Sequence, residues 1–233
     1  MTDKTEDRPE KASRTASPGP VSALSTFVRN SYAEGRSPAL WIAAILVGLV
    51  GGYAALGLRL GIESVQFAAF LDRSEQLASA ARNLSPLHII AAPVVGGIAV
   101  SGLLWLGMAR GWIEETRAGG VADVMEARAI KGGRMSLTHG LWSALIAMVS
   151  LGSGASAGRE GPAVHLGATL ASAVTRPLGL PPRAARIMLA CGAASAVSAS
   201  FNAPVAGALF AFEVILGHYA LRSIAPVAVS SVI

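Results

Sequence analysis

Residues 158–162 read Gly158-Arg159-Glu160-Gly161-Pro162, and this stretch decides how the chain is interpreted. It lies in an apolar region, because residues 137–158 contain no Asp, Glu, Lys or Arg, and residues 161–175 again contain none. A carboxylate in such a setting is costly inside a membrane, and ionisable residues found there are usually functional. We therefore interpret Glu160 as an ion or proton site.

The same stretch favours an anion site at the start of a helix. Pro162 suits a first helical turn, where its missing N–H would have no partner in any case. Gly158 and Gly161 allow backbone amides to come close to a ligand. A helix N-terminus, with open amides and the positive end of the helix dipole, binds anions readily. The stretch thus predicts an anion site and a carboxylate that competes for it.

Composition places the chain in a membrane and excludes several classes of function. Hydrophobic residues make up 52% of the chain and charged residues only 14%, against about 25% charged in soluble domains. The net charge of +5 has no basic stripe with interleaved aromatic residues, so no nucleic-acid partner is expected. Cys191 is the only cysteine, which excludes an internal disulfide and a cysteine metal cluster. We interpret it as a small buried residue, and expect neither a metal site nor a cofactor.

The chain divides into a polar tail and a membrane domain. Residues 1–37 are rich in Ser, Thr, Pro and mixed charge, which predicts a disordered tail rather than a secretory signal. Residues 38–233 form the predicted membrane domain, surrounded by lipid. Basic residues precede the first span and follow the second: Lys4, Lys11, Arg29, Arg36, then Arg110, Arg117, Arg128, Lys131 and Arg134. The positive-inside rule then predicts a multi-pass protein of the plasma (inner) membrane with a cytoplasmic N-terminus and an outer loop over residues 72–82.

Hydrophobic segments predict an all-α membrane protein. The expected helices are Pro38–Leu58 (continuing as a tilted helix toward Phe70), Leu87–Met108, Val121–Ile130, Leu137–Leu151, Gly161–Val174, Pro182–Ala194, Ala203–Leu216 and Leu221–Ile233. Several are too short to span a bilayer, and the small-residue break at residues 152–156 interrupts the pattern. Short, glycine-interrupted helices are typical of discontinuous helices that meet near the midplane. This favours a transporter or channel built from tilted and broken helices.

Two motifs carry a family resemblance. The first is Gly158-Arg159-Glu160-Gly161-Pro162, followed by His165 and Gly167. The second is Gly192-Ala193-Ala194, then Ser200-Phe201-Asn202-Ala203-Pro204-Val205-Ala206-Gly207, Leu209-Phe210 and Glu213. Their order and spacing resemble the GREGP and GAAA…AFNAPLAG…LF..E blocks of the CLC chloride channel and transporter family. The resemblance extends from about Ala39 to the C-terminus.

The resemblance implies a CLC-like fold of two inverted repeats in a homodimer, with a separate chloride pathway in each subunit. Glu160 matches the gating glutamate, whose carboxylate occupies an anion site and swings away or is protonated to admit chloride. The amides of Arg159, Gly161 and Ala163 would line the outer anion sites, beside Gly158 and Pro162. The implied function is channel-like, voltage-gated chloride conduction.

Departures from the family pattern bear on mechanism. The family's GSGIPE motif corresponds here to Ala118-Gly119-Gly120-Val121-Ala122-Asp123, so Gly119 replaces a serine whose hydroxyl reaches the central chloride. The resemblance leaves Gly119 and Gly120 as backbone contacts to the anion, and predicts that Gly119→Ser tightens chloride binding. Val214 stands where proton-coupled members often carry a second glutamate after Glu213. This favours passive conduction, with chloride/proton antiport as the alternative.

Length is a further departure, because the family's membrane unit is roughly twice as long as residues 38–233. The resemblance covers its N-terminal half, which suggests a fragment, a truncated reading frame or half of a split protein. The missing second half is then an expected partner.

Other residues have plainer interpretations. His165 is interpreted as a satisfied packing residue, and Glu213 as an acceptor for backbone amides; both remain candidates for a proton path. Asn202 is predicted to cap the helix that contains Pro204. Gly152-Ser153-Gly154 and His165 invite comparison with an intramembrane serine protease. Leu151 replaces the glycine that this family has two residues before the serine, and the histidine of that family belongs on a separate, later helix than the one His165 occupies. The chain is therefore not expected to be an enzyme.

Overall fold

The computed structural model describes residues 38–71, 84–113 and 116–233, and within these ranges it contains helices and no strands. The elements are α2 (Pro38–Phe70), α4 (Pro86–Ala109), α5 (Val121–Ala129), α6 (Leu137–Gly152), α7 (Glu160–Thr175), a short 3₁₀ turn η1 (Arg176–Leu178), α8 (Pro182–Phe201), α9 (Pro204–Phe210), a π-helical turn η2 (Ala211–Leu216) and α10 (Leu221–Val232). The predicted tail (residues 1–37) and the predicted outer loop (residues 72–82) lie outside the described residues.

Most predicted helices are confirmed to within a few residues, but the boundary between α8 and α9 is not. Asn202 adopts a left-handed conformation (φ 52°, ψ 40°), and its amide donates to the Ser198 carbonyl. Asparagine tolerates this conformation and commonly ends helices. It therefore closes α8, which runs to Phe201 instead of stopping at Ala194. The prediction that Asn202 caps the next helix is wrong, since Ala203 is the N-cap of α9 and no side chain caps it.

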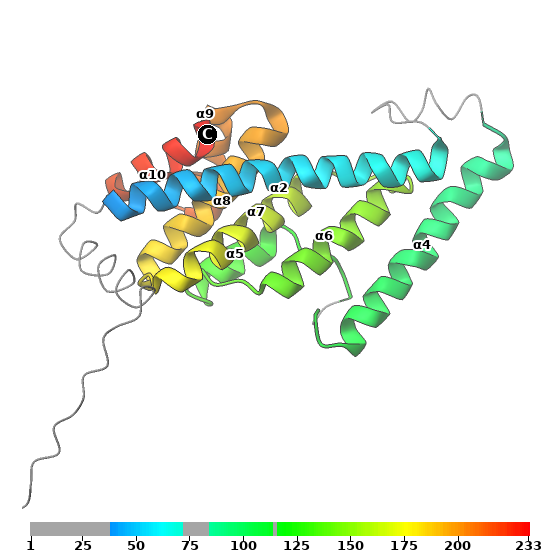
Figure 1. The fold of residues 1–233 in the computed structure, drawn as a ribbon, viewed down its shortest axis with the longest axis horizontal. Coiled ribbons are helices and arrows are strands. Elements are labelled where there is room, and N and C mark those ends of the chain that lie inside the picture. The colour runs from blue at the N-terminus through cyan, green and yellow to red at the C-terminus, as the bar shows by residue number, and fades with distance from the viewer. Residues whose placement is uncertain (1–37, 72–83, 114–115) are drawn as a thin grey trace, which may run out of the picture.

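Within the described ranges, three helices are long and apolar enough to cross a bilayer: α2, α4 and α8. The 33 residues of α2 correspond to about 50 Å, well over the roughly 30 Å hydrocarbon core, so this helix must tilt. In Figure 1, α2 (blue to cyan) runs along most of the length of the helical bundle. The remaining apolar helices are shorter, and residues 153–159 leave the helical conformation between α6 and α7. The predicted bundle of tilted and broken helices is confirmed.

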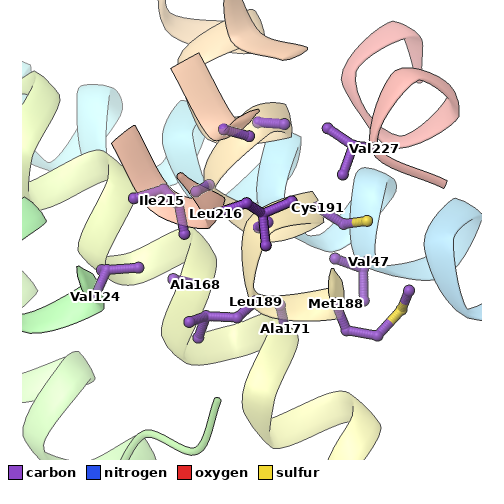
Figure 2. Close-up of a cluster of buried hydrophobic side chains, with 14 of the residues drawn as sticks. Val47, Val124, Ala168, Ala171, Met188, Leu189, Cys191, Ile215, Leu216 and Val227 are labelled. Atoms are coloured by element: carbon purple, nitrogen blue, oxygen red, sulfur yellow. The ribbon is translucent and has the colours of Figure 1, made fainter. Parts of the chain in front are cut away.

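The centre of the fold is α8, which packs against α7, α2, α10 and α9. Every residue from Met188 to Ser198 is buried. Figure 2 shows part of the surrounding cluster, with Val47 of α2, Val227 of α10 and Leu216 near the same stretch of α8. Cys191 is fully buried there, as predicted. By contrast, α4 lies at one end of the molecule (Figure 1), where it packs mainly on α6 and leaves most of its apolar surface exposed.

Glycines allow α7 and α8 to approach closely. A Cβ on Gly192 would overlap the carbonyl oxygen of Gly167, and a Cβ on Gly167 would reach the carbonyl oxygen of Gly192. Small residues bring helices together in this way inside membranes, where lipid chains are as apolar as leucine and packing drives association. A hydrogen bond from the Ser230 hydroxyl to the Cys191 carbonyl (2.9 Å) joins α10 to the same region. These contacts hold α7, and hence its N-terminus, against the core.

Candidate anion site

The N-terminus of α7 leaves backbone donors open. Arg159 is the N-cap residue, and no side chain caps the helix. Pro162 has no N–H, and the amide of Ala163 donates to the Arg159 carbonyl at 3.1 Å. Among the described residues, the amides of Glu160 and Gly161 have no acceptor. These two groups, at the positive end of the α7 dipole, are donors that an anion could use.

The side chain of Glu160 folds back over this terminus. A Cβ on Gly158 would overlap Oε2 of Glu160, so glycine at this position makes room for the carboxylate. The side chain is half-buried, and it forms no hydrogen bond or ion pair among the described residues, including none with Arg159. The carboxylate thus lies close to the open amides without being fixed by a partner.

The expected contribution of Ala163 is not supported by its geometry. Its amide is already used inside α7, because the first intrahelical hydrogen bond closes at this residue. The residue is also buried, with 2% of its surface exposed. Ala163 is therefore a packing residue in this conformation, while Gly161 keeps an open amide.

The N-terminus of α5 is arranged differently, because a carboxylate of the chain already occupies it. The amide of Gly120 donates to Asp123 Oδ2 at 2.6 Å, as in a capping box. Arg117 donates to both carboxylate oxygens of Asp123, at 2.9 and 2.8 Å. Burial opposes ionisation of Asp123, but these hydrogen bonds outweigh it and hold the pKa of the carboxyl below its ordinary value. In this conformation Asp123 therefore occupies the Gly120 amide, and contact of that amide with an anion stays a prediction.

Gly119 meets His165 of α7. A Cβ on Gly119 would overlap the edge of the His165 imidazole that carries Nε2. Only 1% of His165 is exposed, and its Nε2 has no hydrogen-bond partner. Its ring lies against that of His139, with the centroids 5.4 Å apart and the planes at 90°. His165 is thus a packing residue, as predicted, but it is not satisfied, and it fills the space that a side chain at position 119 would need.

This contact reverses the expectation for Gly119→Ser. We now predict that the substitution lowers the stability of the protein by about 1–3 kcal/mol, because overpacking forces the buried imidazole to move. In a His165→Ala background, where the imidazole is absent, Gly119→Ser should lower the stability much less. The measurement is thermal unfolding followed with a thiol-reactive dye, which reports exposure of Cys191, the only cysteine and a fully buried one. The control is Gly120→Ser, where a Cβ meets nothing within 4 Å; equal melting temperatures for Gly119→Ser and Gly120→Ser would contradict the prediction.

Glu213 has a different partner from the one predicted. Its Oε1 accepts a hydrogen bond from the Tyr219 hydroxyl at 2.7 Å, where backbone amides were expected. This hydrogen bond raises the pKa of Tyr219 above its ordinary value. Glu213 belongs to the π-helical turn η2, an element that occurs often near functional sites. Its side chain is exposed on the described part of the chain.

The geometry counts against the protease comparison. The Ser153 hydroxyl donates to the Ser150 carbonyl at 3.0 Å, so its proton is not directed at a base. Its side chain fills the space beside Gly96 of α4, while the His165 ring contacts Gly119 and His139. The described residues also contain no group of three or more His, Cys, Asp or Glu that could hold a metal ion.

Sequence reasoning missed Arg117 and His139. Asp123, three residues after Gly120, is a recognisable capping pattern, but nothing in the sequence indicates that Arg117 pairs with it. His139 lies 26 positions before His165, and only the packing of α6 on α7 brings the two rings together. It also lines an open cavity of about 310 Å³ with Asp123, Glu126, Lys131 and Arg134.

Among the described residues, three apolar helices of spanning length pack with shorter and broken ones, and this arrangement defines a multi-pass integral membrane protein. Comparisons with known proteins give the family. Residues 101–233 match the family model of the voltage gated chloride channel. The chain belongs to this family, the CLC family.

Individual relatives agree with this assignment. The chain is 31% identical over 192 residues to the voltage-gated ClC-type chloride channel ClcB of Citrobacter koseri, and 33% identical over 190 residues to ClcB of Escherichia coli O81 (strain ED1a). Each match covers 82% of this chain and 44% of the relative, so the chain spans less than half the length of these proteins. The crystal structure of a slow cyanobacterial Cl⁻/H⁺ antiporter matches with a TM-score of 0.62 and 24% identity, over 83% of this chain and 45% of that one. This last match confirms the fold.

Proposed function

We propose that this chain supplies one half of a chloride pathway in which Glu160 is the gate. The observation that carries the proposal is the carboxylate of Glu160, which folds back over Gly158 beside the open amides of α7. A carboxylate and a chloride ion need the same donors at a helix N-terminus. In the structure the carboxylate lies near these amides without accepting from them, so its charge would exclude an anion until the carboxylate swings away or is protonated.

The complete pathway needs more than the described residues. The relatives are more than twice as long as the matched region, and the resemblance assigns the matched region to the first of two inverted repeats. We propose that a second half completes each pathway, that two subunits form a homodimer in lipid, and that the N-terminus is cytoplasmic in the plasma (inner) membrane. Chloride is the transported ion, and the proposal requires no cofactor and no enzymatic step.

The test is chloride efflux from proteoliposomes that contain the complete subunit. A chloride-selective electrode follows release after the membrane potential is clamped with a potassium ionophore. The expected result is efflux well above that of protein-free liposomes. Efflux equal to that of protein-free liposomes, from protein shown to be folded by the burial of Cys191, would contradict the proposed function.

Coupling of chloride movement to proton movement distinguishes passive conduction from chloride/proton antiport. Val214 follows Glu213, so we expect chloride to move without tightly coupled protons. The measurement imposes a chloride gradient without a proton gradient and follows external pH, with an uncoupler as the control for leak. Sustained uphill proton movement would decide for an antiporter.

The antiporter remains the second candidate because of one observation. His139 borders an open cavity and contacts the buried His165 ring, which reaches Gly119 at the start of α5. Imidazoles in contact are suited to passing a proton. If uphill proton movement is found, His139→Gln should reduce it more than it reduces chloride movement.

A further inference from the structure

A strongly basic cavity lies away from the candidate anion site. It has a volume of about 310 Å³ and is formed by the end of α5, the first turns of α8 and α10, and the loop that precedes α10. Four arginines and one histidine line it: Arg128, Arg183, Arg186, Arg222 and His218. The other lining residues are uncharged, so among the described residues no carboxylate shares its wall.

The positive charge of this cavity is not neutralised within the described part of the chain. None of its four arginines forms an ion pair with a carboxylate there. Arg128 donates to the Leu216 carbonyl, and Nε of Arg186 is buried without a partner. A buried donor left unsatisfied is unfavourable, and so are like charges gathered around one cavity. Both features favour the binding of an anion.

His218 and the helix termini add further donors and positive potential. Nδ1 of His218 accepts a hydrogen bond from the Ala220 amide at 3.3 Å, so the neutral ring carries its proton on Nε2, which can donate to a ligand. Both α8 and α10 begin beside the cavity, and neither has an acidic residue in its first turn. Their positive dipole ends are therefore not offset by the chain itself.

We propose that this cavity binds a phosphate group, and that the phosphate belongs to an anionic lipid. Guanidinium groups match phosphate oxygens in charge and geometry. The volume is at the lower end of the range for ligand pockets, which suits a single headgroup. The site goes beyond the proposed chloride pathway, and its occupancy does not depend on whether the chain conducts chloride.

The position of the cavity favours a lipid over a soluble phosphate. It lies at the first turn of α8, a helix long and apolar enough to span the membrane, and lipid phosphates lie at that depth. Leu221, the first residue of α10, is 86% exposed beside Arg222 and offers an apolar surface to an acyl chain. A lipid with its headgroup in the cavity and an acyl chain along α10 would pair with the arginines and cover the exposed leucine.

The experiment measures thermal unfolding of the complete protein in detergent, through exposure of Cys191 to a thiol-reactive dye. Phosphatidylglycerol is titrated, with phosphatidylcholine as the zwitterionic control and inorganic phosphate and pyrophosphate as the soluble probes. The double variant Arg183→Gln/Arg222→Gln removes two exposed charges from the cavity. The matched control is Arg176→Gln, an exposed arginine of η1 that does not line the cavity.

The expected result is stabilisation by phosphatidylglycerol and not by phosphatidylcholine. The double variant should bind phosphatidylglycerol roughly 10- to 30-fold more weakly. Each arginine near an anionic lipid surface contributes about 1 kcal/mol, which is roughly fivefold in affinity, and the variant loses two arginines. Arg176→Gln should bind as the wild type does. If inorganic phosphate or pyrophosphate stabilises the wild type as strongly as phosphatidylglycerol does, the cavity binds phosphate, but the proposal that this phosphate belongs to a lipid is overturned.

Two outcomes would overturn the whole proposal. The first is that phosphatidylglycerol and phosphatidylcholine stabilise the wild type equally while neither inorganic phosphate nor pyrophosphate has an effect. This comparison uses only the wild type, so it does not depend on whether the variants fold. The other is an equal loss of binding in Arg176→Gln and in the double variant, which would indicate a general effect of surface charge.

Discussion

Replacing Glu160 with glutamine in the complete subunit is expected to raise chloride flux about tenfold and to make it nearly independent of pH. Glutamine keeps the size of the side chain but carries no charge, so it competes poorly for the α7 amides. A hydrogen bond to a charged group contributes roughly 1.5–3 kcal/mol, and 1.4 kcal/mol corresponds to a tenfold change in occupancy. The pH dependence should disappear because the gate no longer has a group that titrates.

The measurement is chloride efflux from proteoliposomes between pH 3 and pH 7, which includes the range in which carboxyl groups of proteins ordinarily change charge (roughly pH 3 to 5.5). Glu126→Gln is the matched control, because Glu126 is a carboxylate of α5 that pairs with Lys131 at 3.1 Å. The control should keep the flux and the pH profile of the wild type. A Glu160→Gln variant that also keeps the full pH profile would rule out Glu160 as the gate.

Replacing Gly192 with valine is expected to destabilise the protein by about 3 kcal/mol or more. The backbones of α7 and α8 are so close that even one added carbon overlaps the Gly167 carbonyl. Overpacking costs typically 1–3 kcal/mol, and here the obstacle is backbone, which cannot rotate away as a side chain can. Separation of these helices would also displace the N-terminus of α7, so chloride flux should fall with stability.

Thermal unfolding in detergent, followed by the exposure of Cys191, measures this effect. The control is Gly57→Val on α2, where an added Cβ meets nothing within 4 Å. It should unfold at the temperature of the wild type or slightly above, because valine is more favourable than glycine within a helix. A Gly192→Val variant as stable as the Gly57→Val control would show that α7 and α8 are not packed as described.

Helices and their approximate ends could be predicted because local signals were strong. Pro182 and Pro204 start helices, and the small-residue break after Leu151 ends α6, as their conformational preferences require. The end of α8 could not be predicted, since asparagine serves equally well before a helix and after one. Only the left-handed conformation of Asn202 decides between these roles.

The candidate site could be predicted where it depends on neighbouring residues and not where it depends on packing. Gly158, Glu160 and Gly161 are close in sequence, so their arrangement at one helix N-terminus followed from local chemistry. The contact between Gly119 and His165 joins residues 46 positions apart and appears only when α5 packs on α7. The basic cavity likewise collects residues from separate elements, so no local pattern in the sequence indicates it.

Anion binding at the N-terminus of α7 decides whether Glu160 and the anion compete for the same amides. The measurement is bromide anomalous scattering from crystals of the complete subunit, wild type and Glu160→Gln, at one pH and one bromide concentration. The account predicts a bromide peak within hydrogen-bonding distance of the Gly161 amide that is much stronger in Glu160→Gln than in the wild type. Equal peaks in both proteins, or no peak at this amide in either, would contradict it.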